Sequence, residues 1–432
     1  MGNAKKRSGS VASMLPVLLA CSFTASFGQS MMNVALPELA ERFGVTLSIA
    51  NWVIVGYMVV AATAIMLSAF MLRRLGLRRV FFVGAGALAL GSACALLSQD
   101  FPMLFASRLV QAVGTGLFFP SVTSVIMTNS PAAVRGTRLA LNSGVIAVGL
   151  AISPTASGFA LTQFGWRAMF VVSLAMSVAL LAVGFFRIHG GPSTKRVPID
   201  ALSVMLGPLG LAAFLYGLGE VTRDLAPSLA ALAVGAVLLA LFAWRQFALE
   251  SPLLDLHPLV HPRFAVGILL VMVGMLTSFS MSILLPLYYE GALGYTAFFA
   301  GLLLLGPVLV NAAFTFLGGR VFDRHGAWPL IPAGLVLVLV GQAAAFFSAE
   351  SMIAILIVLS SAAVYAGAGF VVAPSKTAAL GTLPSAMYSA GASINSTAVQ
   401  IASADSTPTN SDEPRAEAIC TAVELIEAPA EY

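Results

Sequence analysis

The sequence predicts an all-α polytopic membrane protein. Twelve mostly uncharged apolar stretches recur along the 432 residues, each close to the length of about 20 residues that crosses a bilayer as a helix. The chain is 59% hydrophobic and only 9% charged, with a mean hydropathy of +0.95. A soluble protein of this size needs many more polar residues to cover its surface. We therefore expect the lipid bilayer to be its surroundings.

The apolar stretches follow one another with short connectors. We place the spans at 14–36, 50–72, 79–98, 103–127, 138–163, 167–187, 201–219, 227–247, 264–289, 296–319, 328–348 and 351–373. A weaker thirteenth candidate covers 386–402. The first span is too long for the apolar region of a signal peptide, so we expect it to be retained.

Basic residues indicate the orientation of these spans. Seventeen Lys and Arg residues fall on one side of the expected topology and three on the other. The larger set is Lys5, Lys6, Arg7, Arg73, Arg74, Arg78, Arg79, Arg135, Arg138, Arg187, Lys195, Arg196, Arg245, Arg263, Arg320, Arg324 and Lys376. The positive-inside rule places that side, with the N-terminus, in the cytoplasm. The net charge of +4 thus reflects topology, and a nucleic-acid partner has no support.

Two short basic turns of similar shape suggest an internal repeat. They are Ala69–Gly76, after the second span, and Gly319–Gly326, after the tenth. Two parallel halves are typical of transporters. The expected domains are a cytoplasmic N-terminal segment (1–13), a six-helix half (14–187), two inserted helices with polar connectors (188–263), an incomplete C-terminal half (264–402) and an acidic disordered tail (403–432).

Motifs of enzymes and metal proteins are missing from the sequence. Cys21, Cys94 and Cys420 are scattered, without the spacing of a disulfide framework or a metal site. Gly-rich phosphate loops and nucleophile–base arrangements are also missing. We expect no enzyme activity, no catalytic residues, no cofactor and no metal.

Seven segments together resemble the major facilitator superfamily, specifically its fourteen-span drug:proton antiporter branch. They are Asn33–Pro37, Trp52–Tyr57, Arg108–Gly114, Gly149–Gly158, Trp166–Phe170, Glu250–Leu256 and Gly319–Gly326. The resemblance runs from about residue 12 to about residue 400. It implies a bundle of two six-helix halves with two inserted central helices, and export of amphipathic molecules coupled to protons.

The fourth span carries a buried cation. Arg108, Gln111 and Thr115 recur at i, i+3 and i+7, and therefore share one face of the helix. A guanidinium in hydrocarbon costs several kcal/mol unless it faces a partner or water, so Arg108 must point into the bundle. The resemblance links this Arg to proton coupling. The alternative is a structural Arg that binds backbone carbonyls of a neighbouring helix.

The fifth span contains small residues at four-residue spacing. Gly149, Ser153 and Ser157 form a stripe that allows close helix packing. Pro154 is expected to kink the helix, and Gly158 ends a motif that is similar to the antiporter motif of the family. We expect this face to be a sliding or sealing surface between the halves.

Two positions depart from the family pattern. Gly28 stands where relatives carry an Asp in the first span, and Arg73 replaces the Asp of the first basic turn. The second basic turn keeps its acid as Asp323, beside Arg324. In the family this Asp latches one conformation, so one latch is expected to be altered and the other intact.

Proton coupling requires a titratable group inside the membrane. The first six spans hold no Asp or Glu well inside them, and no span contains His. The nearest acids are Glu220 and Glu290, at the outer ends of helices. Coupling through Glu290 and a mechanism without ion coupling both remain open.

Polar residues near the middle of the spans are candidates for binding a substrate. Gln29 and Asn33 share a face of the first span at i and i+4. The other candidates are Tyr57, Gln111, Asn142 and Asn311, although core packing is an alternative role for each. Without an embedded carboxylate, a neutral or anionic amphipathic substrate is favoured over a dication.

The sequence predicts a monomeric secondary transporter of the inner membrane that exports small amphipathic molecules or drugs by alternating access. Protons are the coupling ion that the resemblance implies. The alternatives are an uncoupled facilitator and a transport-inactive, truncated or sensor-like membrane protein. The second alternative is suggested by the missing final span, the acidic tail, Gly28 and Arg73.

Overall fold

The structure is a computed structural model that describes residues 2–188, 200–219, 225–249, 252–295, 297–349, 351 and 353–404. Glu220, most of the 188–200 connector and the acidic tail from residue 405 lie outside the described residues. The long helices are α1 (Gly2–Ser30), α3 (Leu47–Leu75), α4 (Leu77–Leu96), α5 (Phe101–Asn129), α6 (Arg135–Phe164), α7 (Arg167–Arg187), α8 (Ala201–Gly219), α9 (Leu225–Ala248), α10 (Pro262–Leu287), α11 (Ala297–His325), α12 (Leu330–Ala349), α13 (Ala354–Gly381) and α14 (Tyr388–Ala404).

The remaining elements are short. They are α2 (Leu36–Phe43), the 3₁₀ turns η1 (Ala132–Val134), η2 (His257–Val260) and η4 (Ser385–Met387), and the π-helical turn η3 (Tyr288–Ala292). Ten helices in the described part are long and apolar enough to cross a membrane, and Met14–Ser30 and Ala201–Phe214 are shorter apolar helices. The expected all-α membrane fold is therefore confirmed.

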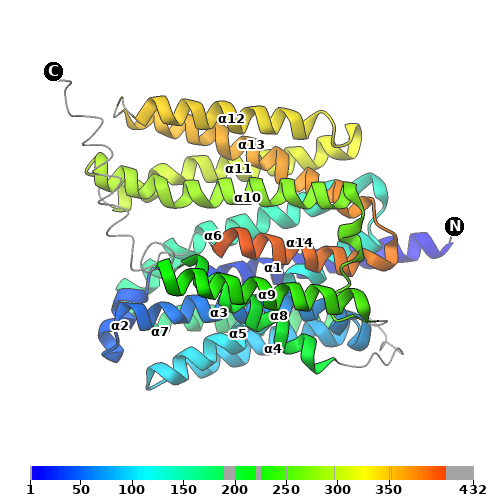
Figure 1. Ribbon diagram of the computed structural model, residues 1–432, viewed down its shortest axis with the longest axis horizontal. Coiled ribbons are helices and arrows are strands. Elements are labelled where there is room, and N and C mark those ends of the chain that lie inside the picture. Colours follow the sequence, from blue (N-terminus) through cyan, green and yellow to red (C-terminus); the bar gives the residue numbers. More distant parts are fainter. Residues whose placement is uncertain are drawn as a thin grey trace.

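The helices run roughly side by side in two groups (Figure 1). Helices α10 to α13 form the upper group in that view, and α1 to α5 with α7 to α9 form the lower one. Between them, α6 packs against α11, and α14 packs against α3, α5 and α10. Helices from distant parts of the chain therefore lie side by side at the boundary between the groups.

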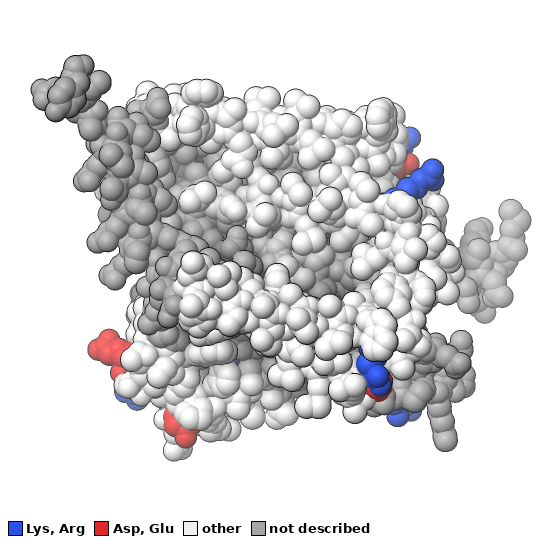
Figure 2. Space-filling view, viewed as in Figure 1, with Lys and Arg blue, Asp and Glu red and all other residues white. Residues whose placement is uncertain are grey.

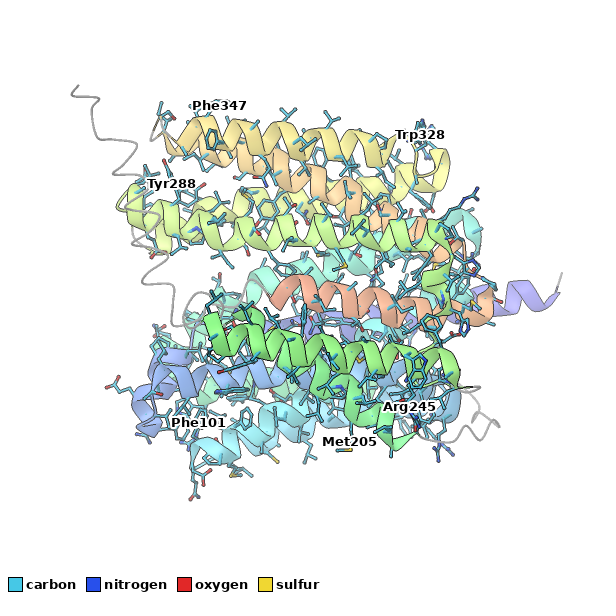
Figure 3. The ribbon with its side chains drawn as sticks, in the orientation of Figure 1. Phe101, Met205, Arg245, Tyr288, Trp328 and Phe347 are labelled. Atoms are coloured by element: carbon cyan, nitrogen blue, oxygen red, sulfur yellow. The ribbon has the colours of Figure 1, made fainter. Side chains whose placement is uncertain are left out.

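Charged residues gather at the ends of the bundle. On the face shown in Figure 2, Lys, Arg, Asp and Glu lie at the two ends and a broad uncharged belt separates them. The α3–α4, α5–α6 and α11–α12 connections share one end, which we call the basic end. Trp328 and Arg245 lie near this end in Figure 3, and Phe101 and Tyr288 near the opposite end. This charge distribution suits a helical bundle that spans a bilayer.

Two spans end at positions that differ from those expected. Helix α1 ends at Ser30, and turns at residues 31–35 lead into α2. Pro37 lies in the first turn of α2, where its missing N–H costs nothing, whereas inside a longer α1 it would remove a helical hydrogen bond. Helix α13 continues beyond residue 373 to Gly381. Lys376, counted as a connector residue above, is therefore a helical residue with an exposed fraction of 6%.

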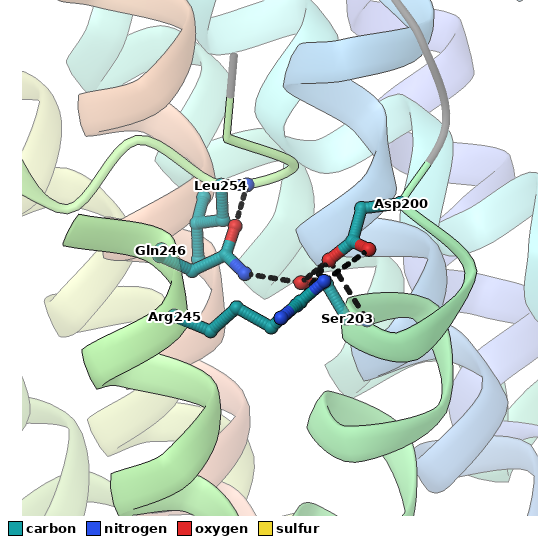
Figure 4. Close-up of polar contacts among 5 residues, drawn as sticks. All are labelled: Asp200, Ser203, Arg245, Gln246 and Leu254. Carbon is teal, nitrogen blue, oxygen red and sulfur yellow. Dashed lines mark hydrogen bonds and ion pairs between the residues drawn. The ribbon is translucent and has the colours of Figure 1, made fainter. Parts of the chain in front are cut away.

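A polar network joins the basic ends of α8 and α9 (Figure 4). Arg245 donates to the Asp200 carboxylate from Nε at 2.7 Å and from Nη2 at 2.9 Å. The Ser203 hydroxyl also donates to Asp200 and accepts a bond of 2.7 Å from Gln246. The side-chain amide oxygen of Gln246 accepts a hydrogen bond from the backbone N–H of Leu254 at 3.1 Å. The network thus holds the following connector against the α8–α9 pair.

Candidate functional site

Arg108 on α5 is fully buried, with an exposed fraction of 0%. Its Nη1 donates to the backbone carbonyl of Gly28 on α1 at 3.0 Å and to Gln111 Oε1 at 2.6 Å. Among the residues that the structure describes, its Nε and Nη2 have no hydrogen-bond partner. The guanidinium therefore lies inside the bundle and binds the exact stretch of α1 where the family pattern carries an acid.

Gln111 connects Arg108 to two more helices through hydrogen bonds. Its Nε2 donates to Ser92 on α4 at 2.8 Å, and the Ser92 hydroxyl donates to Ser173 on α7 at 3.0 Å. These bonds use both ends of the Gln111 amide within the lower group of helices. Gln111 thus positions Arg108.

Tyr57 on α3 covers the other side of the cation. The guanidinium carbon of Arg108 lies 4.1 Å from the centroid of the Tyr57 ring, a distance at which the ring quadrupole attracts a cation. The Tyr57 hydroxyl and Thr115 Oγ1 are 2.6 Å apart. The structure thus brings Tyr57, Arg108 and Gln111 together, with Gly28 beside them.

The small-residue stripe of α6 faces α1. A Cβ added at Gly149 would meet the side chain of Ser26, and the Ser153 hydroxyl donates to the Phe27 carbonyl at 2.7 Å. Helix α1 belongs to the same predicted half as α6, so the expected sealing surface between halves is wrong for this face. Small side chains let α6 approach α1 closely enough for this hydroxyl to reach the α1 backbone.

The contact between groups lies instead at the basic end of α6. Asp323, near the end of α11, accepts the backbone N–H of Gly136 at 2.7 Å and that of Thr137 at 2.8 Å. Its second oxygen also accepts the Thr137 hydroxyl at 2.6 Å. A carboxylate is favoured at this position because the first N–H groups of a helix lack partners and carry partial positive charge. We call this arrangement the α6–α11 clamp.

The helices touch at the clamp. A Cβ added at Gly319 would lie 2.3 Å from the Cβ of Ala140 and 2.7 Å from the carbonyl oxygen of Gly136. Nearby, Arg135 donates to the Tyr388 hydroxyl on α14 at 3.2 Å. The basic end is therefore closed between α6, α11 and α14.

Helices α3 and α14 meet at the same end. The hydroxyls of Ser68 and Ser393 are 2.9 Å apart. Arg73, in the altered basic turn, donates to the backbone carbonyl of Pro252 at 2.8 Å. This residue thus holds the connector that leads from the inserted helices to α10.

The structure separates the remaining predicted residues. Gln29 donates to Gln400 on α14 at 3.3 Å, whereas Asn33 is exposed in the turn after α1 and does not share a helix face with Gln29.

The other predicted residues lie elsewhere in the bundle. Asn142 accepts the Ser22 hydroxyl at 2.7 Å, and Asn311 donates to the Tyr365 carbonyl at 2.8 Å. Glu290 and Arg324 are exposed near opposite ends of the bundle, and Pro154 and Gly158 are partly buried within the unbroken α6.

Sequence reasoning missed Gly136, Thr137 and Gln400, and it placed Lys376 in a connector. Gly136 and Thr137 act through backbone N–H groups, which leave no side-chain signal. Gln400 is a polar residue within the weak thirteenth span, and that position was its only signal. Lys376 could have been found from the apolar residues that follow it up to Leu380. Among the residues that the structure describes, no cluster of His, Cys, Asp or Glu could hold a metal ion.

Comparisons with known proteins agree with this architecture. The 16% identical proton:xylose symporter XylE has a TM-score of 0.65, and the match covers 92% of this chain and 87% of that one. The human organic anion transporter MFSD10 has a TM-score of 0.62 at 15% identity, covering 91% and 92%. These two matches show the fold alone.

Sequence relatives are more similar. The chain is 32% identical to the lincomycin resistance protein LmrB of Bacillus subtilis over 76% of this chain and 69% of that protein. It is 30% identical to the uncharacterized transporter YhcA of the same organism over 76% of this chain, and the match spans only 62% of YhcA. The sequence profile of the Major Facilitator Superfamily matches residues 18–404. The chain therefore belongs to the major facilitator superfamily.

Proposed function

We propose that this protein exports small amphipathic molecules across the cytoplasmic membrane by alternating access, as a monomer with its N-terminus in the cytoplasm. Relatives named for resistance to lincomycin and methylenomycin, and the multidrug resistance protein Stp, support an export role. The observation that carries the proposal is the α6–α11 clamp, because Asp323 joins helices from the two predicted halves.

The clamp suits a two-state mechanism. With 14–187 and 264–402 as the halves, the contacts of α6 with α11 and of α3 with α14 close the basic end. Opening that end requires the bonds between Asp323 and α6 to break, so the clamp exists in one state only. Helix α8 packs on α3 and on α9, so the two predicted inserted helices lie against the first half through α8.

We further propose that export is coupled to protons. The family resemblance supports it, yet α1 and the long helices α3 to α7 carry no Asp or Glu in the described part of the chain. Glu290, in the π-helical turn after α10, is exposed, and it is the acid that we assign to coupling. A facilitator without ion coupling is the second candidate, favoured by the absence of an interior carboxylate from those spans.

Reconstitution tests these functions. Purified protein in liposomes is loaded with an amphipathic fluorescent dye, with and without an imposed pH gradient. Dye movement that depends on the gradient supports the coupled exporter, and Glu290→Gln should then abolish the dependence. Movement that ignores the gradient identifies a facilitator. No movement with folded protein contradicts both and favours the transport-inactive alternative.

A further inference from the structure

Arg108 has unused hydrogen-bonding capacity on one edge of its guanidinium group. Its Nη1 donates to both Gly28 and Gln111, whereas Nε and Nη2 have no acceptor in the described part of the chain. The side chain is fully buried, so these two donors forgo hydrogen bonds that water would otherwise supply. Nε and Nη2 are adjacent donors on one edge, the arrangement that binds both oxygens of a carboxylate.

The described residues place no negative charge against this cation. Its contacts are the Gly28 carbonyl, the Gln111 amide and the Tyr57 ring, and each of these groups is neutral. Across the described residues, no Asp or Glu forms an ion pair with Arg108. Burial of a guanidinium without a counter-charge is unfavourable, so an anion that reached it would be bound favourably.

The packing around α1 leaves room for an added side-chain atom at Gly28. A Cβ added at Gly28 would meet one neighbouring atom within 4 Å, the Tyr57 hydroxyl at 3.9 Å. By contrast, a Cβ added at Gly56 would lie 2.6 Å from the ring of Phe105. The α1 backbone is therefore loosely packed at the residue that touches Arg108.

A second unused donor lies on α14, next to the α1 residue that follows Gly28. Gln29 donates to Gln400, and Nε2 of Gln400 is buried without an acceptor among the described residues. This contact joins α1 to α14, so it crosses the boundary between the predicted halves. The region around Gly28 thus combines unused N–H groups, room and a contact that alternating access would break.

We propose that the space beside Gly28 binds the carboxylate of the transported molecule, with Nε and Nη2 of Arg108 as its donors. The cargo would then be a small amphipathic carboxylic acid, which supplies the negative charge that the described residues do not place against Arg108. The inference rests on the proposed function only in naming the ligand as cargo, because binding is measured without transport.

The test compares two probes of the same shape. Purified full-length protein in the neutral detergent dodecyl maltoside is titrated with dansylaminoundecanoic acid and with its uncharged primary amide, and dansyl emission reports binding. Because the amide lacks the charge, we expect the acid to bind at least about tenfold more tightly. Equal affinities in the wild-type protein would overturn the proposal.

A substitution at Gly28 tests whether the acid binds beside Arg108. Gly28→Asp places a carboxylate in the space beside Arg108, and we expect it to weaken acid binding about tenfold or more while amide binding stays within twofold. Gly86→Asp is the matched control on α4, where nothing lies within 4 Å of an added Cβ, and it should keep the acid preference. Retention of the preference in Gly28→Asp contradicts the assigned site.

The two proposals can fail separately. If Gly28→Asp does not give a monodisperse protein, the wild-type comparison of acid and amide still decides whether the anion is preferred. Acid binding without transport in liposomes contradicts export and leaves the site standing. Transport of both probes at equal rates and equal affinities contradicts the carboxylate site and leaves export standing.

Discussion

The ring of Tyr57 lies 4.1 Å from the guanidinium carbon of Arg108, so an aromatic face covers the buried cation where a carboxylate could have done so. Both side chains are almost completely buried. The contact joins α3 to α5 next to the end of α1, and its strength is therefore part of the stability of the lower group of helices.

Removing the Tyr57 ring should destabilise the protein more than removing its hydroxyl. Tyr57→Leu loses a desolvated cation–π contact of about 2 kcal/mol, whereas Tyr57→Phe keeps the ring and leaves Thr115 with a lost bond of about 1 kcal/mol. Thermal unfolding in dodecyl maltoside measures both variants. Equal losses of stability would show that the ring face contributes nothing.

Neutralising the clamp should open the basic end. Asp323→Asn loses charge-assisted bonds to Gly136 and Thr137, which are typically worth about 1.5–3 kcal/mol each. We expect maleimide to label Ala140→Cys about tenfold faster, in a protein whose native cysteines are replaced by serine. Arg320→Gln, one turn away on α11, removes a charge that stacks on Phe316 of the same helix. An unchanged labelling rate is expected for this control, and a rise as large as that in Asp323→Asn would contradict the clamp.

A methyl group between α6 and α11 should also be destabilising. Gly319→Ala places a Cβ 2.3 Å from that of Ala140, and overpacking of this kind typically costs about 1–3 kcal/mol. Gly306→Ala on the same helix has nothing within 4 Å of its Cβ and should be neutral or slightly stabilising. Thermal unfolding of the pair measures the difference. Similar midpoints would mean that the helices separate at little cost.

The Asp200 network predicts an acid-sensitive contribution to stability. Hydrogen bonds from Arg245 first, and then from Ser203, hold the pKa of Asp200 well below its ordinary value. Stability from a lowered carboxyl pKa is fully present above the unfolded pKa of about 4 and is lost as pH falls toward the folded pKa. Asp200→Asn should therefore lower the unfolding midpoint at pH 7 and progressively less below about pH 4. A difference that stays constant between pH 7 and pH 3 would contradict this assignment.

The spans could be predicted because the bilayer fixes their length. An apolar run of about 20 residues has few alternatives to a membrane helix, and the all-helical fold was read from this pattern. The ends of spans were harder to place, since polarity does not decide them. Helix α1 stops at Ser30 although apolar residues continue, and Lys376 lies inside α13 although it is charged.

The candidate site was predicted only where one helix determined the geometry. The shared face of Arg108 and Gln111 follows from helical periodicity. The hydrogen bond between Gln29 and Gln400 joins residues that are 371 positions apart, and no local sequence pattern predicts such a pair. For the same reason, the small-residue face of α6 is expected between the halves but meets α1, because small residues indicate close packing without identifying the partner helix.

Two of the bonds that Asp323 accepts come from the main chain of α6, so they constrain the choice of residues on α6 very little. Every residue except proline offers the same N–H, so substitutions at Thr137 would leave two of the three bonds intact. We therefore expect few substitutions to be tolerated at position 323 and many to be tolerated at position 137. Related chains could diverge at the start of α6 while the closed state persists.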